Sequence, residues 1–385
     1  MRDFISSRTQ RIPPSGIRRF FDIVQEMDDV ISLGVGEPDF DTPWVACEAG
    51  IASVEQGQTS YTSNRGLPEL RIETSRYLAK RFGVHYHPDK EILITTGASE
   101  ALDIAIRAIT DPGDEILIAE PSYVSYSPGV TLSDGIPVPV PCLMEDEFRL
   151  TPEALMEKIT PKSKAIICNF PNNPSGAVMS REDYRGIADV ICDHDLLLIS
   201  DEIYTEMTYD GEMTSAVQAD GMQERTILVN GFSKAYAMTG WRVAYLCAPK
   251  ELCDATLKIH QYVMLSAPTM SQYAAIGALK NADWNREEMV TEYQMRRNLF
   301  VRGLNRIGLK CHLPRGAFYA FPSIQEFGIS DVEFAERLLK EQHVAVVPGS
   351  VFGASGEGHL RCAYAVSRDD LREAVQRIEA FIATL

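Results

Sequence analysis

Short apolar runs alternate with segments of helical spacing through the middle of the chain, from about residue 45 to residue 275. Each run is rich in Val, Ile and Leu and is bounded by Gly, Pro or polar residues, which is typical of strands buried on both faces. In chain order the runs are EILITTG, DEILIAE, KAIICNF, LLLISDE, TILVNGF and WRVAYLC. This alternation predicts an α/β fold with a mostly parallel central sheet covered by helices.

Helical patterns also occur nearer the two ends of the chain. Residues 15–27 carry apolar side chains at helical spacing, and Ser15 is a favourable N-cap. Residues 289–308 form a longer helical pattern, and residues 369–385 form a closing one. These segments predict structure outside the central sheet at both ends of the chain.

Composition narrows the class of protein. The net charge is −17, from 54 acidic and 37 basic residues, which argues against binding to nucleic acid or to an anionic membrane. No apolar run approaches the ~20 residues that cross a bilayer, and the polar N-terminus lacks the apolar segment of a secretory signal. The eight cysteines lack CxxC spacing, so we expect buried, reduced thiols in a cytoplasmic protein and no metal site.

An unusual set of residues follows the predicted strands directly. Ligands bind at the carboxyl ends of strands in sheets of this kind. Taken singly, each of these residues is more often structural than functional, but together they provide a helix N-terminus for a phosphate, an aromatic platform, an amide, a buried carboxylate and an amine. In chain order these are Ala98 and Ser99, Tyr123, Asn173, Asp201 and Lys234. Pyridoxal phosphate requires this combination of groups.

Lys234 lies in the turn between two of the predicted buried strands, TILVN and WRVAYLCA. A lysine held near the core loses solvation, which lowers its pKa and makes its amine available as a nucleophile. The alternative for an isolated Ser-Lys pair is an ordinary surface loop.

Several motifs resemble those of one known family in sequence and order. The chain resembles the class I/II aminotransferases of pyridoxal-phosphate fold type I, most of all the subgroup of aspartate and aromatic amino-acid aminotransferases. The resemblance extends from GVGEPDFDTP at residue 34 to RCAYAV at residue 361, and the segment from Gly231 to Arg242 is its most specific motif. The supporting motifs are YTSNRGLPELR, NNPSG, SDEIY, GAFYAFP and VPGSVFG.

This resemblance implies roles for the residues around the cofactor. Lys234 is the Schiff-base lysine and the base that moves the substrate proton. Asp201 pairs with the pyridine nitrogen, Tyr204 and Asn173 bind the phenolic oxygen, and Tyr123 stacks on the ring.

The resemblance also implies how the phosphate and the substrate are held. Ala98, Ser99, Ser233 and Arg242 bind the phosphate, and Tyr61 reaches the phosphate of the neighbouring subunit in a homodimer. The substrate α-carboxylate is expected to contact Gly36, Asn173 and Arg361. Gly231 departs from the serine that many relatives carry, and the sequence leaves the roles of Arg65 and Arg315 open.

The expected architecture and reaction follow from the same resemblance. The large domain is expected over residues 46–276, and a smaller α+β domain over residues 1–45 and 277–385. The expected reaction is a ping-pong transfer of an amino group between an L-amino acid, aromatic or aspartate-type, and a 2-oxo acid. An aromatic amino acid is the first choice.

Three other functions are alternatives to transamination. A C–S or C–N β-lyase of the same fold would share every cofactor residue. A pyridoxal-dependent transcription regulator is disfavoured, because only about thirty residues precede the GEPDF turn and the chain is acidic. A non-enzymatic α/β binding protein is disfavoured by the ordered set of residues at the strand ends.

Overall fold

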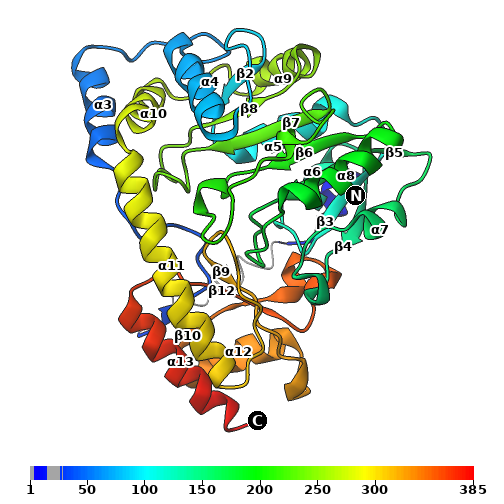
Figure 1. Cartoon of the computed structure of the whole chain (residues 1–385), viewed down its shortest axis with the longest axis vertical. Coiled ribbons are helices and arrows are strands. Elements are labelled where there is room, and N and C mark those ends of the chain that lie inside the picture. The colour runs from blue at the N-terminus through cyan, green and yellow to red at the C-terminus, as the bar shows by residue number, and fades with distance from the viewer. Residues whose placement is uncertain (1–3, 15–26, 28) are drawn as a thin grey trace.

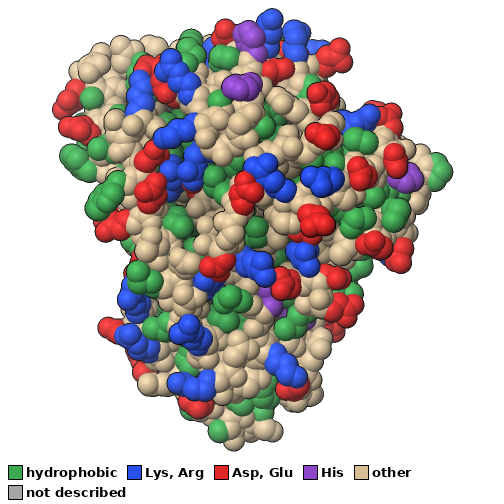
Figure 2. Space-filling view, in the orientation of Figure 1, with side chains coloured by type: hydrophobic (Ala, Val, Ile, Leu, Met, Phe, Trp, Pro, Cys, Tyr) green, Lys and Arg blue, Asp and Glu red, His purple; other side chains and the backbone are tan. Residues whose placement is uncertain are grey.

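The computed structural model describes residues 4–14, 27 and 29–385. The helix predicted over residues 15–27 lies outside the described residues, apart from Met27. Among the residues that are described, no helix is long and apolar enough to cross a membrane. Acidic and basic side chains are interspersed over the face seen in Figure 2.

A seven-stranded sheet forms the centre of the larger part of the molecule (Figure 1). The predicted α/β fold with a mostly parallel sheet is confirmed, because β8 alone runs opposite to the other six strands. In the order β2-β8-β7-β6-β5-β3-β4, the strands are β2 (Ile92–Thr95), β8 (Ala244–Cys247), β7 (Thr226–Gly231), β6 (Leu197–Asp201), β5 (Ser163–Asn169), β3 (Glu115–Glu120) and β4 (Ile136–Pro141).

Six of these strands coincide with the predicted apolar runs, and β4 is the exception. Its sequence is IPVPVP, and proline cannot donate to a strand ladder. The strand therefore lies at the edge of the sheet, where β3 is its neighbour on one side only.

Helices cover both faces of the sheet because successive strand residues point to opposite sides. In β3, Ile116 and Ile118 pack with α5 and α6 on one face, whereas Leu117 and Ala119 pack in the core that includes α8 on the other. The helices of this larger part are α3 (Trp44–Glu55), α4 (Pro68–Phe82), α5 (Ala98–Ile109), α6 (Tyr126–Leu132), α7 (Pro152–Met156), α8 (Arg181–Asp193), α9 (Lys250–Val263) and α10 (Thr269–Asn281).

The long helix α11 (Asp283–Arg306) runs from the larger part into a second body of helices and short strands (Figure 1). A three-stranded antiparallel sheet, in the order β11-β12-β9, and a parallel pair, β1-β10, lie in this second body. Its elements are α12 (Asp331–Gln342), α13 (Arg368–Ile382), β1 (Ile31–Ser32), β9 (Tyr319–Ala320), β10 (Val344–Ala345), β11 (Val347–Pro348) and β12 (Leu360–Ala363).

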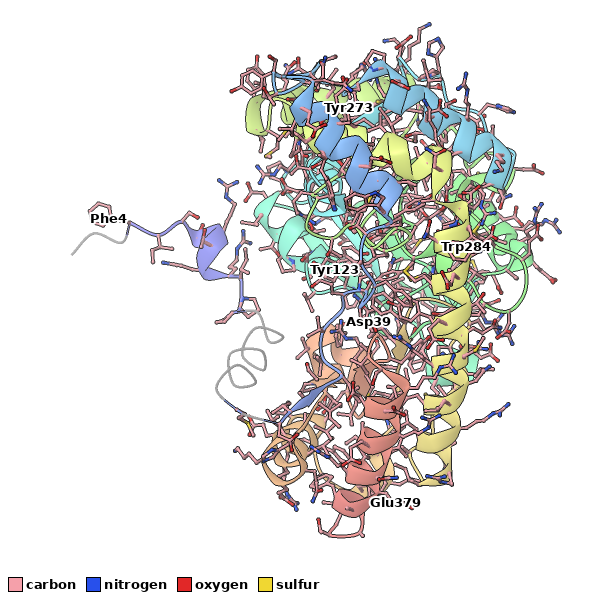
Figure 3. All side chains as sticks on the ribbon, turned by 90° about the vertical axis from the view of Figure 1, so that its left-hand side faces the viewer. Phe4, Asp39, Tyr123, Tyr273, Trp284 and Glu379 are labelled. Atoms are coloured by element: carbon pink, nitrogen blue, oxygen red, sulfur yellow. The ribbon has the colours of Figure 1, made fainter. Side chains whose placement is uncertain are left out.

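Short 3-10 helices and a short N-terminal helix complete the described structure. The N-terminal helix is α1 (Ser7–Gln10), and Phe4 before it stands away from the body of the molecule in Figure 3. The 3-10 helices are η1 (Met144–Asp146), η2 (Thr205–Met207), η3 (Ala216–Gln218), η4 (Gln325–Phe327), η5 (Gly349–Phe352) and η6 (Ala354–Gly356).

A buried ionic network attaches α11 to the segment that follows β6. Glu206 accepts hydrogen bonds from Tyr77 and Arg81, and Arg286 lies 3.1 Å from its second oxygen. Glu206 and Arg286 are both buried, and an unpaired charge there would be costly, so the network fixes the start of α11 to η2.

All eight cysteines are free thiols. Six are buried, as the sequence predicts, but the expectation of burial is wrong for Cys47 and Cys192, which are partly exposed. Both lie on helices, α3 and α8, on faces that other elements cover only in part.

Candidate active site

A cavity of about 540 Å³ opens at the carboxyl ends of the central strands. Figure 3 shows Tyr123, one of its lining residues, at mid-height, where the larger part of the molecule meets the second body. The cavity brings together every residue predicted for the site except Tyr61. These residues are Gly36, Ala98, Ser99, Tyr123, Asn173, Asp201, Tyr204, Ser233, Lys234, Arg242 and Arg361.

Lys234 projects into this cavity from the turn between β7 and β8. Its Nζ donates to the carbonyl of Gly36, and the side chain is accessible only in part. Burial lowers the pKa of Lys234 to about 8, and the nearby cations Arg361 and Arg242 act in the same direction, against the Glu37 carboxylate. The amine is therefore far easier to deprotonate than an exposed lysine.

Asp201 ends β6 and is buried. The Tyr126 hydroxyl donates to its Oδ2 at 2.7 Å, and the Ile203 N–H donates to its Oδ1 at 3.3 Å. Burial raises the pKa of Asp201 to about 6, although both hydrogen bonds and the charge of Lys234 oppose that shift. A carboxyl with this pKa is largely ionised at pH 7 and fits a protonated ring nitrogen as partner.

The turn between β2 and α5 has the geometry of an anion cradle. Gly97 has φ +80°, a backbone conformation that favours glycine, and a Cβ there would lie 2.4 Å from Nη2 of Arg242, so the guanidinium would have to move away. The N-cap of α5 makes no side-chain hydrogen bond, which leaves the first-turn N–H groups of Ala98 and Ser99 available to an anion. Ser233 lines the same cavity.

Arg361 comes from β12 in the second body and is 3% exposed. Its Nη1 donates to Oδ1 of Asn173 at 3.0 Å and its Nη2 to the carbonyl of Gly34. Its guanidinium carbon lies 4.7 Å and 4.9 Å from the ring centroids of Tyr319 and Phe352. Nε has no partner, and within the described chain no carboxylate forms an ion pair with this arginine. A buried fork of donors without an anion is suited to a carboxylate ligand.

Three cavity contacts were not predicted from the sequence. The hydroxyls of Tyr204 and Tyr319 lie 2.7 Å apart, Tyr126 holds Asp201, and Glu37 lies near Lys234. Tyr319 stands in the GAFYAFP motif and Glu37 in GEPDF, so the sequence marked their segments. It gave no sign of which side chain reaches the cavity, because those contacts join residues far apart in the chain.

The remaining candidates lie away from the cavity. Tyr61 is 84% exposed. Arg65 pairs with Asp254, and Arg315 lies 3.5 Å from Glu147, so each of these arginines has a partner outside the site.

Comparison with known proteins agrees with this geometry. The family model for aminotransferase class I and II matches residues 28–378. The chain belongs to this family. It is a pyridoxal-phosphate-dependent aminotransferase of fold type I.

Individual relatives cover nearly the whole chain of this aminotransferase. A putative aminotransferase, YugH, of Bacillus subtilis is 53% identical, with 99% of each chain covered. An aspartate aminotransferase of Pyrococcus abyssi is 45% identical, with 97% of each covered. The solved aromatic aminotransferase of Pyrococcus horikoshii is 44% identical, with a TM-score of 0.91 over 96% of this chain and 99% of that one. All three relatives are named as aminotransferases, which favours a transferase over a lyase.

The described residues of the aminotransferase fit its cofactor. The Gly97 turn leaves room for Arg242 beside a helix N-terminus, which suits a phosphate. Asp201 offers a buried carboxylate, and Lys234 offers an amine of lowered pKa in the same cavity.

Replacing Lys234 by methionine is expected to stabilise the apoenzyme at pH 7. Unfolded lysine keeps its proton up to about pH 10.5, whereas the folded side chain loses it above about pH 8. Between these values the unfolded chain binds more protons, so wild-type stability rises with pH. Below pH 8 the penalty is at most about 3 kcal/mol, and Lys234→Met removes it.

Urea unfolding of both apoenzymes from pH 7 to pH 10.5 measures this difference. The difference in free energy of unfolding between Lys234→Met and wild type should become smaller as the pH rises. Lys258→Met, at an exposed lysine, is the matched control, for which no such difference is expected. Equal stability of Lys234→Met and wild type at pH 7 would contradict the burial of a costly ammonium group.

Proposed function

We propose that this enzyme transfers the amino group of an aromatic or aspartate-type L-amino acid to a 2-oxo acid, in two half-reactions, with Arg361 binding the α-carboxylate. The single observation that carries the proposal is the buried guanidinium of Arg361, which has no carboxylate partner among the described residues and one unused donor, Nε. A 2-oxo acid carries the same carboxylate as an amino acid, so one clamp serves both half-reactions.

The cofactor is proposed to be held by four sets of residues. Ala98, Ser99, Ser233 and Arg242 would hold the phosphate. Lys234 would hold the cofactor covalently, Asp201 would bind the ring nitrogen, Tyr204 and Asn173 would bind the phenolic oxygen, and Tyr123 would pack on the ring. When bound, pyridoxal phosphate supplies an electron-withdrawing ring that stabilises negative charge at the substrate Cα.

The proposed chemical work of the chain centres on proton transfer. With a pKa of about 8, roughly a tenth of Lys234 is unprotonated at pH 7, far more than of an ordinary lysine, so its Nζ can take the proton from the substrate Cα and return it elsewhere. Asp201 keeps a proton on the ring nitrogen through its negative charge. Asn173 orients Arg361 through the 3.0 Å hydrogen bond between them.

Two parts of the chain are proposed to act as separate domains. Residues 46–276 would form the large domain, and residues 1–45 and 277–385 the small domain. Arg361 comes from the second part and Asn173 from the first, so a carboxylate bound between them would draw the parts together and exclude water from the site.

The lining of the cavity favours an aromatic substrate over an acidic one. Among the described residues, Lys234, Arg242 and Arg361 are the only lysines and arginines that line it, and each has a proposed role with the cofactor or the α-carboxylate. Glu37 also lines it, and a carboxylate there would repel an acidic side chain. Apolar surface is contributed by Leu102, Val124 and Ile203.

A half-reaction screen of the holoenzyme tests this proposal. Phenylalanine, tyrosine, aspartate and alanine are each mixed with the enzyme, and the cofactor absorbance and the 2-oxo acid formed are followed. Aromatic amino acids are expected to react fastest. Arg361→Met should lower kcat/KM by about 10²-fold or more through loss of a buried charge-assisted pair.

Phenylethylamine, which lacks the carboxylate, is the control substrate and should react equally with wild type and Arg361→Met. Arg315→Met, at an exposed arginine outside the cavity, is the control variant. A normal rate with phenylalanine in Arg361→Met, or elimination products in place of 2-oxo acids, would contradict the proposal.

The active unit is proposed to be a cytoplasmic homodimer. Exposed apolar side chains gather on α3 and at the end of α9, including Trp44, Ile51, Val54 and Tyr262, which is 87% exposed. The segment that carries Tyr61 lies beside them, because the carbonyl of Leu265 accepts a hydrogen bond from Asn64. A second copy covering this apolar surface would place Tyr61 at the partner's phosphate.

Charged substitutions on this surface are expected to separate the subunits. Ile51→Asp with Tyr262→Asp should sediment as a monomer, because each places a carboxylate in an apolar interface. Tyr61→Phe should remain a dimer but bind pyridoxal phosphate about tenfold less tightly, through loss of one hydrogen bond. A monomeric wild type, or unchanged affinity in Tyr61→Phe, would contradict the shared site.

A further inference from the structure

A buried pair, Glu100 and His260, lies next to the anion cradle, which is the turn between β2 and α5, and outside the cavity. Glu100 stands in the first turn of α5, and His260 stands near the end of α9, which packs against α5. The His260 Nδ1 lies 2.5 Å from the Glu100 Oε1, and the two side chains are 0% and 8% exposed. Neither lines the cavity that holds Lys234.

The second oxygen of Glu100 holds the turn that precedes the helix. Oε2 accepts a hydrogen bond from the backbone N–H of Thr96, the residue before Gly97. Gly97 is the left-handed residue against which the Arg242 guanidinium lies. The Glu100 carboxylate thus connects α9 to the turn before α5, because Oε1 contacts His260 and Oε2 accepts from Thr96.

The hydrogen-bond roles within the pair follow from its chemistry. An ionised carboxylate only accepts, so the Nδ1 of His260 must donate to it. The Nε2 of His260 is buried without a partner, so Glu100 is the only side chain among the described residues that holds the ring through a hydrogen bond. Removing the Nδ1 donor would leave the Glu100 Oε1 unpaired in a buried place, which is costly.

We propose that His260 and Glu100 are positioning residues for cofactor phosphate, holding the backbone from Thr96 to Ser99 in the conformation that binds the anion. Without His260, the carboxylate turns toward solvent and releases the Thr96 N–H. The turn that carries the Ala98 and Ser99 donors then loses its support, and phosphate affinity falls. This inference rests on the proposed function, which assigns the phosphate to that turn.

The experiment compares two ligands of the full-length apoenzyme, pyridoxal phosphate and pyridoxal, which lacks the phosphate. Their dissociation constants are measured by titration of the cofactor absorbance. His260→Leu is expected to bind pyridoxal phosphate about tenfold more weakly, the equivalent of one buried hydrogen bond, with pyridoxal affinity unchanged. His260→Asn, which keeps an N–H donor near the Nδ1 position, is expected to restore most of the phosphate-dependent affinity.

Thr256→Val is the matched control on α9, because Thr256 is also fully buried but its hydroxyl bonds only to the carbonyl of Cys253. It should leave both affinities unchanged. Glu100→Ala tests the pair from the α5 side if His260→Leu does not fold, and it should reproduce the selective loss.

Two results would overturn the inference. One is unchanged pyridoxal phosphate affinity in His260→Leu or Glu100→Ala, and the other is an equal loss for both ligands, which indicates general damage to packing. Equal wild-type affinity for the two ligands would instead refute the phosphate cradle itself. The test therefore separates failure of the positioning pair from failure of the proposed function.

Discussion

The rest of the site depends on an imbalance of charge within the cavity at the carboxyl ends of the central strands. Among the residues that the structure describes, three basic side chains, Lys234, Arg242 and Arg361, and two carboxylates, Asp201 and Glu37, line it. The chain as a whole carries a net charge of −17, so this local excess of cations runs against its composition. Of the three, Arg361 is buried, and a buried guanidinium needs an anionic partner, the place that we propose for the substrate carboxylate. Burial of the Lys234 amine in the same cavity lowers its pKa.

The fold produces this imbalance by joining strand ends from two parts of the chain. The central sheet supplies Asp201 at the end of β6 and Lys234 after β7, and the antiparallel β12 of the second body supplies Arg361. Contacts between Arg361 and Asn173 and between Tyr204 and Tyr319 connect the two parts. The aminotransferase site is therefore formed where these two parts of the chain meet.

The sequence predicts what depends on local pattern and misses what depends on distant contacts. Apolar runs predicted six strands of the central sheet, because burial on both faces leaves a continuous signature, whereas the proline-rich edge strand β4 has none. Because ligands bind at the carboxyl ends of parallel strands, the sequence predicts that Asp201 and Lys234 share one site. Only the family resemblance predicts that Arg361 belongs to it. The Tyr126 contact to Asp201 and the Glu100–His260 pair were missed, because each joins residues at least 75 positions apart.

Lys234 is proposed to be the amine that holds the cofactor. Reduction of the holoenzyme with borohydride fixes the cofactor to its lysine, and peptide mass spectrometry then locates the label. We expect one labelled peptide, containing Lys234, and no label when the apoenzyme is treated in the same way. A stoichiometric label on any other lysine, with Lys234 unmodified, would contradict it.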